Sequence, residues 1–149
     1  MQLKDFIPNV KKEFGKIFFS GISFDSSKVK KNDIFFAIKG NKFDGNKFIS
    51  HAIKNGSRII VSENKPDKYK NGILFINKKN IRKLLAEVSS KIYNKKPKNL
   101  IAVTGTNGKS SVSDFYYQIL RLNKKRVASI GTLGVKAENL NIKLSNTTI

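Results

Sequence analysis

The chain has 149 residues, no cysteine and a formal net charge of +20, from 30 Lys or Arg against 10 Asp or Glu. This length suits one ordinary domain, or one small domain with part of another, and 39% hydrophobic residues favour a packed core over disorder. The lack of cysteine excludes disulfides and Cys-based zinc sites, and no apolar run approaches the ~18 residues that a membrane-spanning helix needs.

The N-terminal part alternates strand-like runs with one helical pattern. Residues 33–38 (DIFFAI) and 58–62 (RIIVS) are short apolar runs that predict strands. Between them, residues 46–56 carry apolar side chains at helical spacing and end on Asn55-Gly56, a helix stop. A strand, a helix and a strand with short connections predict a parallel strand pair.

Further along, the pattern changes to a longer helix and then a linker. Residues 64–72 are expected to be a polar loop, and residues 73–76 (ILFI) a strand. A helical period starts at Asn80, and the apolar face of that helix carries Ile81, Leu84, Leu85, Val88 and Ile92. The basic, proline-containing segment 94–99 is the expected linker.

After the linker, residues 100–104 (LIAVT) predict a buried strand leading into a glycine-rich loop. A helix should begin at Lys109 with its inward face made of Val112, Phe115, Ile119 and Leu122, and residues 126–132 predict another strand. A further extended piece is expected near the C-terminal end. The fold class is therefore α/β, with a small N-terminal domain (1–82) and the truncated start of a second, parallel-sheet domain (83–149).

The loop GTNGKS, Gly105–Ser110, has the composition of a phosphate-binding loop, although its spacing differs from G-x-x-x-x-G-K-[ST]. Glycines let backbone N–H groups turn toward phosphate oxygens, and the helix start adds partial positive charge. Lys109 can bridge terminal phosphates, and the Ser110 hydroxyl can hold Mg²⁺. We expect Lys109 and Ser110 to be catalytic, with Ser110 the metal ligand; the ATP-binding residues are Gly105, Thr106, Asn107, Gly108, Lys109, Ser110 and Ser111.

The same loop resembles the shortened G-T-x-G-K-[ST] loop of the Mur ligases and the folylpolyglutamate synthetases. The segment before it resembles the uridine-nucleotide-binding domain of Mur ligases, which folylpolyglutamate synthetases lack. The family's Asp-Ser-Arg, Gly-Asp and Asp-Gly pairs correspond to Asp25-Ser26-Ser27, Asn32-Asp33 and Asp44-Gly45. Ser27 thus replaces an arginine, and Asn32 replaces a glycine.

Within that family, SIGTLGV and SNTT resemble the type that adds the third amino acid of the stem peptide (MurE type). The resemblance implies substrate contacts at Phe24, Ser26, Asn41, Lys42, Phe43, Asn146, Thr147 and Thr148. On the residues alone, Phe24 could be a core residue, Ser26 a turn residue and the Asn-Thr-Thr a chain end. The single histidine, His51, is expected to be a surface residue rather than a catalyst.

The resemblance also implies a reaction. Such a ligase uses ATP and Mg²⁺ to phosphorylate the free carboxylate of UDP-MurNAc-L-Ala-D-Glu, and the amine of diaminopimelate or lysine attacks the resulting acyl phosphate. We expect a cytoplasmic monomer that uses no membrane. The chain stops soon after the expected second strand of the ATPase sheet, so it is expected to be an N-terminal fragment without activity alone.

Two alternatives stay open. The D-alanyl-D-alanine adding Mur ligase shares the first domain and the loop. A non-enzymatic basic binding module would use the positive charge to bind nucleic acid. Because 26 of the 30 basic residues are Lys, whereas bidentate phosphate or base recognition uses Arg, we interpret the charge as compositional and do not expect nucleic acid as a partner.

Overall fold

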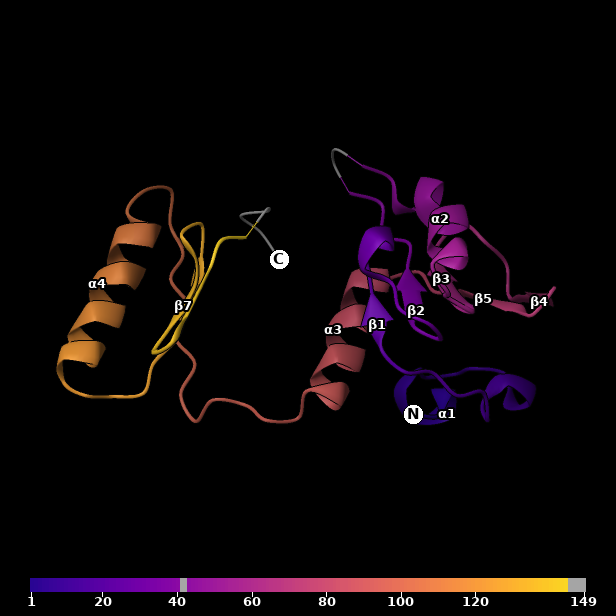
Figure 1. Ribbon diagram of the computed structural model, residues 1–149, viewed down its shortest axis with the longest axis horizontal. Helices are drawn as coiled ribbons and strands as arrows, with labels where there is room; N and C mark the ends of the chain where they lie inside the picture. The colour runs from indigo at the N-terminus through magenta and orange to yellow at the C-terminus, as the bar shows by residue number, and fades with distance from the viewer. Residues whose placement is uncertain (41–42, 145–149) are drawn as a thin grey trace. The chain divides into compact units, whose positions relative to one another are not determined.

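The structure of the protein is a computed structural model that describes residues 1–40 and 43–144 (Figure 1). The chain forms two compact units that divide between Lys96 and Pro97, within the predicted linker. The domain boundary expected after residue 82 falls instead inside a helix, α3 (Ile81–Ile92). In the two described stretches, no helix is both long and apolar enough to cross a bilayer. Both units combine helices and strands, so the α/β class is confirmed.

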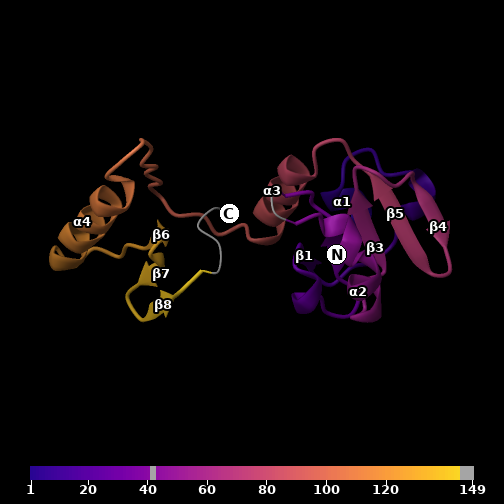
Figure 2. The ribbon, with the colours of Figure 1, turned by 90° about the horizontal axis from the view of Figure 1, so that it is seen from above.

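A five-stranded sheet forms the centre of the first unit (Figure 2). Its order is β1-β2-β3-β5-β4, in which the first four are parallel and β4 is an antiparallel edge strand. The bounds are β1 Ile22–Ser23, β2 Ile34–Phe36, β3 Ile59–Ser62, β4 Lys68–Lys70 and β5 Ile73–Asn77. The predicted parallel pairing of the two strands that flank the helix is confirmed, with Ile34 opposite Ile59.

Strand β4 was missed because its segment was expected to be a polar loop. All three of its residues are exposed, and Lys68 and Lys70 flank Tyr69, so the segment has no apolar side to produce a strand signal. Its pairing with β5 is set by the turn at Asn71 and Gly72, both with positive φ. Charged side chains on an edge strand also discourage pairing with another chain.

Both faces of the sheet are buried, which explains why β2 and β3 read as continuous apolar runs. Ile34 and Phe36 pack on one face with residues of α1 (Leu3–Phe6) and α3. Phe35 and Ile60 pack on the other with α2 (Ile49–Lys54). Three short 3₁₀ helices complete the unit: η1 Lys12–Phe14, η2 Ser26–Lys28 and η3 Gly45–Phe48.

The two predicted helices of this unit start at side-chain caps. The Asp44 carboxylate accepts a bond of 2.9 Å from the Asn46 N–H, which begins η3 and leads into α2. The Asn80 side chain accepts a bond of 3.0 Å from the Lys83 N–H and begins α3. The predicted apolar face of α3 is confirmed, because Ile81, Leu84 and Val88 are buried and Leu85 and Ile92 pack against the same core.

The second unit contains α4 (Lys109–Leu122) and a three-stranded antiparallel sheet, β6 (Ser129–Gly131), β7 (Gly134–Ala137) and β8 (Leu140–Ile142). The start of α4 is as predicted, but the expected parallel sheet is not present in residues 97–144. Residues 100–104 form no strand and are exposed. They have no pairing partner in this stretch, so apolar composition alone does not make them a strand.

The predicted inward face of α4 is wrong for this structure. Val112, Phe115, Ile119 and Leu122 are all exposed, Leu122 to 83%. Within residues 97–144, Gly134 is the only buried residue, so this unit has no apolar core for the helix to pack on. The amphipathic pattern correctly predicted a helix. It does not show which other part of the protein packs against the apolar side of that helix.

Helix α3 should contribute directly to the stability of the first unit. Leu84 is 4% exposed, so Leu84→Ala should lower the free energy of unfolding of this unit by about 2–5 kcal/mol through lost burial and a residual cavity. Urea unfolding followed through the amide signals of β3 measures this. The matched change Leu122→Ala should alter it by less than about 0.5 kcal/mol. Equal effects of the two substitutions would contradict the placement of α3 in the first core.

Candidate phosphate-binding site

The glycine-rich loop joins an exposed segment to the start of α4, and its backbone needs glycine at two positions. Gly105 has a φ of 148° and Gly108 a φ of 75°. Gly108 is the N-cap of α4 in the left-handed conformation, where a side chain would be strained. A Cβ at Gly108 would meet nothing within 4 Å, so conformation rather than space is what selects glycine there.

The start of α4 offers free N–H groups. Gly108 provides no side-chain cap, and the first helical bond runs from the Val112 N–H to the Gly108 carbonyl at 2.9 Å. The N–H groups of the first helical turn have no partner within a helix, and the helix dipole places partial positive charge at the same end. This arrangement has the chemistry to bind a phosphate oxygen, and phosphate binding by the loop stays a prediction.

Lys109 closes the loop on itself. Its ammonium donates to the Gly105 carbonyl and, at 3.0 Å, to the Thr106 carbonyl. The lysine side chain therefore folds back over the residues that come just before the helix, which keeps its positive charge at the loop. A phosphate at the helix start would lie within reach of the same ammonium.

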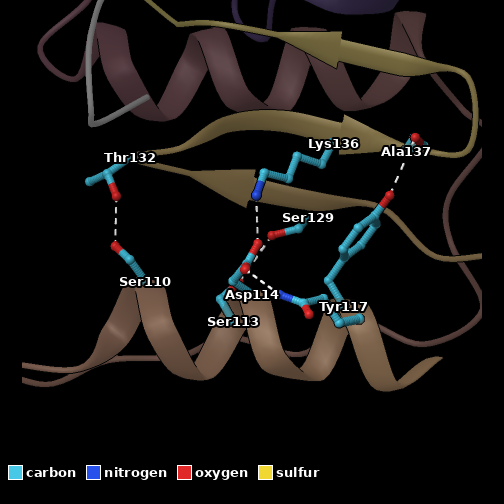
Figure 3. Close-up of polar contacts among 9 residues, drawn as sticks. Ser110, Ser113, Asp114, Tyr117, Ser129, Thr132, Lys136 and Ala137 are labelled. Atoms are coloured by element: carbon cyan, nitrogen blue, oxygen red, sulfur yellow. Dashed lines mark hydrogen bonds and ion pairs between the residues drawn. The ribbon is translucent and has the colours of Figure 1, made fainter. Parts of the chain in front are cut away.

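A polar stripe along α4 faces the strands. Figure 3 shows Ser110, Ser113, Asp114 and Tyr117 pointing from the helix toward β6 and β7. The Ser110 hydroxyl lies 2.6 Å from the Thr132 hydroxyl, and the Ser113 hydroxyl 3.1 Å from that of Ser129. The Tyr117 hydroxyl donates to the Ala137 carbonyl at 3.4 Å. These contacts, rather than apolar packing, hold the helix on the strands.

Asp114 carries the strongest of these contacts. Lys136 on β7 binds its Oδ1 atom at 2.6 Å, and the Gln118 amide donates to Oδ2 at 2.6 Å. The hydrogen bond from Lys136, followed by that from Gln118, holds the pKa of the Asp114 carboxyl below its ordinary value. Asp114 is therefore an ionised group at neutral pH whose position is fixed from two sides.

These groups open onto one cavity of about 410 Å³ inside the second unit. Lys109 and Ser110 from the predicted loop line it, and so do residues that the sequence did not single out as site residues, among them Asp114, Thr132 and Lys136. Asp114 could have been found from its helical spacing, since it follows Ser110 by one turn. Thr132 lies in the turn between β6 and β7, and Lys136 lies on β7; the sequence does not give the pairing of these strands or their placement against α4.

In the first unit, Ser26 is tied to α2 rather than free in a turn. Its hydroxyl lies 2.9 Å from His51 Nδ1, and the Asn55 amide donates to the Ser26 carbonyl at 2.8 Å. Phe24 and Phe43 are exposed to 61% and 72%, so Phe24 is not a core residue. His51 is exposed, in agreement with its expected surface position.

The departures from the expected Mur pattern have local explanations. Ser27 donates from its N–H and its hydroxyl to the Asp25 carboxylate, at 3.0 and 2.7 Å, and this holds the pKa of Asp25 below its ordinary value. Asn32 has a φ of 64°, a conformation that glycine adopts freely and asparagine tolerates better than most residues. Asn32 thus keeps a turn at the place of the family's glycine.

Several expected substrate-binding residues lie outside the described residues: Asn41, Lys42, Asn146, Thr147 and Thr148.

Among the described residues, no three His, Cys, Asp or Glu side chains are grouped so as to hold a metal ion. The cavity beside the loop is lined by the hydroxyls of Ser110 and Thr132 and by the carboxylate of Asp114, and oxygen donors of these kinds are ones that Mg²⁺ accepts.

Residues 18–105 match the family described as Mur ligase family, catalytic domain, which is more than half of the chain. The chain belongs to the Mur ligase family. This confirms the resemblance that the loop and the N-terminal segment indicated.

Several curated relatives of this Mur ligase chain carry the name UDP-N-acetylmuramoyl-L-alanyl-D-glutamate–2,6-diaminopimelate ligase. The protein from Rickettsia prowazekii (strain Madrid E) is 45% identical over 116 residues, covering 78% of this chain and 24% of that protein. The protein from Wigglesworthia glossinidia brevipalpis is 39% identical over 158 residues, covering 99% of this chain and 32% of that one. The chain thus spans about a quarter to a third of the length of these relatives.

Solved structures agree with the Mur ligase fold. A UDP-N-acetylmuramoyl-L-alanyl-D-glutamate–2,6-diaminopimelate ligase matches with a TM-score of 0.72 at 24% identity, over 95% of this chain and 29% of that chain. MurF ligase from Thermotoga maritima in complex with ADP matches with a TM-score of 0.54 at 28% identity, over 70% of this chain and 23% of that one.

The Asp114–Lys136 pair gives a test of the site geometry. Because the folded-state pKa of Asp114 is lowered, its ionised form stabilises the fold above pH ~4, and this contribution is lost as the pH falls through the folded pKa. Lys136→Met should raise the Asp114 pKa toward its ordinary value, measured from the carboxyl ¹³C shift against pH. Lys143→Met, a change at an exposed lysine, is the control. An unchanged Asp114 pKa in Lys136→Met would refute the pair.

Proposed function

We propose that this chain provides the N-terminal part of an ATP-dependent Mur ligase that adds diaminopimelate to UDP-MurNAc-L-Ala-D-Glu in peptidoglycan precursor synthesis. The observation that carries the proposal is the loop Gly105–Ser110 at the start of α4, opening onto a cavity that Lys109 and Ser110 line. The names of the relatives support diaminopimelate over lysine as the added amino acid.

The helix start, Lys109 and Ser110 each have a proposed part in binding ATP and Mg²⁺. The free N–H groups at the start of α4 bind phosphate oxygens, and Lys109 neutralises charge that develops on the terminal phosphate. Ser110 offers one hydroxyl to Mg²⁺, which commonly binds proteins through one or two groups and keeps several waters. ATP would supply the phosphate that converts the substrate carboxylate into an acyl phosphate, from which phosphate is a good leaving group.

The first unit is proposed to bind the uridine nucleotide part of the substrate. Phe24 and Phe43 present exposed rings, and Ser26 has a hydroxyl fixed by His51. Asn41 and Lys42, with Asn146, Thr147 and Thr148, stay proposals for the same substrate. We further propose that the protein is a cytoplasmic monomer. Because the relatives are three to four times as long, these 149 residues alone should show no ligase turnover.

Substrate binding can be tested on the 149-residue chain by calorimetric titration with UDP-MurNAc-L-Ala-D-Glu. Saturable binding is expected, and Ser26→Ala should weaken it about tenfold, which corresponds to the loss of one hydrogen bond of ~1.4 kcal/mol. Ser50→Ala, at an exposed position in α2, should bind as the wild type does.

The same titration separates the alternatives. Tighter binding of UDP-MurNAc-tripeptide than of the dipeptide form would favour the D-alanyl-D-alanine adding ligase. A salt-dependent shift of duplex DNA at physiological ionic strength, without binding of either nucleotide, would favour the basic binding module.

The role of the loop can be tested by ATP titration. Lys109→Ala should weaken ATP binding roughly 10- to 100-fold, because charge-assisted hydrogen bonds to phosphate contribute about 1.5–3 kcal/mol. Lys143→Ala removes the same charge from an exposed position in the same unit and serves as the control. If both variants bind ATP equally, Lys109 acts only through its general charge and the loop assignment fails.

A further inference from the structure

We infer that Thr132 is a positioning residue for the Ser110 hydroxyl, holding it so that an oxygen lone pair faces the divalent cation that accompanies the nucleotide. This inference rests on the proposed function, because it needs Ser110 to bind that cation. It adds Thr132, which directly follows β6, to a candidate site that otherwise consists of the glycine-rich loop and α4.

Ser110 and Thr132 are in direct contact. Ser110 lies in the first turn of α4, and Thr132 follows β6 immediately. Their hydroxyl oxygens are 2.6 Å apart, at the short end of O–H···O hydrogen bonds, and both residues line the same cavity (Figure 3). No other side chain in the described part of the chain has a recorded hydrogen bond to the Ser110 hydroxyl.

The proton of Ser110 decides what this contact does. A hydroxyl has one proton and two lone pairs, and a cation is bound only by a lone pair. The proton must therefore point to an acceptor away from the cation. Thr132 Oγ1, 2.6 Å away, can accept that proton, so with a cation bound Ser110 would be the donor of this hydrogen bond and Thr132 its acceptor.

Without the Thr132 hydroxyl, the Ser110 proton has no side-chain acceptor in the described part of the chain. The Ser110 hydroxyl would then be free to rotate between its staggered positions, and a lone pair would face the cation in only some of them.

The position of Thr132 does not depend on its own contact with Ser110. The Ser113–Ser129 hydrogen bond and the Asp114–Lys136 ion pair already hold β6 and β7 against α4. Removing the Thr132 hydroxyl should therefore leave the strand in place and change only the orientation of Ser110. This makes a shape-conserving substitution a clean test.

The test measures ATP binding by the 149-residue chain as a function of MgCl₂ concentration, and in EDTA. Thr132→Val keeps the shape without the hydroxyl and should lower the apparent Mg²⁺ affinity about tenfold, the usual effect of losing a partner of a metal ligand. Thr132→Ser restores the hydroxyl and should behave as the wild type. In EDTA, all three proteins should bind ATP equally.

Ser110→Ala separates failure of the inference from failure of the proposed function. If Ser110→Ala loses the Mg²⁺ dependence while Thr132→Val keeps it, the role of Thr132 is wrong and the metal role of Ser110 stands. If Ser110→Ala keeps the dependence, or the chain binds no ATP, both fail. Equal weakening of Thr132→Val in MgCl₂ and EDTA would show a structural role and overturn the inference.

Discussion

The residue at which α4 begins determines the arrangement of the whole second unit. Gly108 starts the helix from a left-handed conformation, and from there the helical period places two opposite stripes. The polar stripe, which contains Ser110 and Asp114, meets β6 and β7. The apolar stripe, which contains Phe115 and Ile119, points to solvent. A start one residue later would turn the Ser110 hydroxyl by about 100° away from Thr132.

The two units are stabilised by different kinds of interaction. In the first, a parallel sheet is buried on both faces, and the hydrophobic effect dominates. In the second, hydrogen bonds and one ion pair between α4 and the strands are exposed or only partly buried. Such contacts contribute little net free energy each, so the second unit is the less stable of the two. The candidate phosphate site thus belongs to the part that opens more easily.

The sequence predicted those features that depend on local pattern. The apolar runs of β2, β3 and β5, the period of α3 and the glycine-rich helix start of α4 are all written in neighbouring residues. Features that depend on distant partners were missed. Edge strand β4 is polar, residues 100–104 lack a pairing strand in the described part, and the covering of α4 depends on what lies beside it.

The residues of the candidate site also fall into those that a local pattern predicts and those that depend on distant partners. Lys109 and Ser110 were found because a short motif determines their chemistry. Thr132 and Lys136 were not, because their place in the site follows from the antiparallel pairing of β6 with β7 and from the packing of both on α4. A motif in the sequence thus predicts candidate binding residues, whereas the structure is needed to show which residues lie beside them.

The folded-back Lys109 has a consequence for which anions this loop accepts. Its ammonium already holds two backbone carbonyls, Gly105 and Thr106. An ammonium has three N–H donors, and neutral carbonyls do not cancel its charge, so one donor and the full positive charge stay available to an anion at the helix start. The two carbonyl bonds therefore fix where that charge is held, and a multiply charged phosphate group would gain more from it than a singly charged anion would.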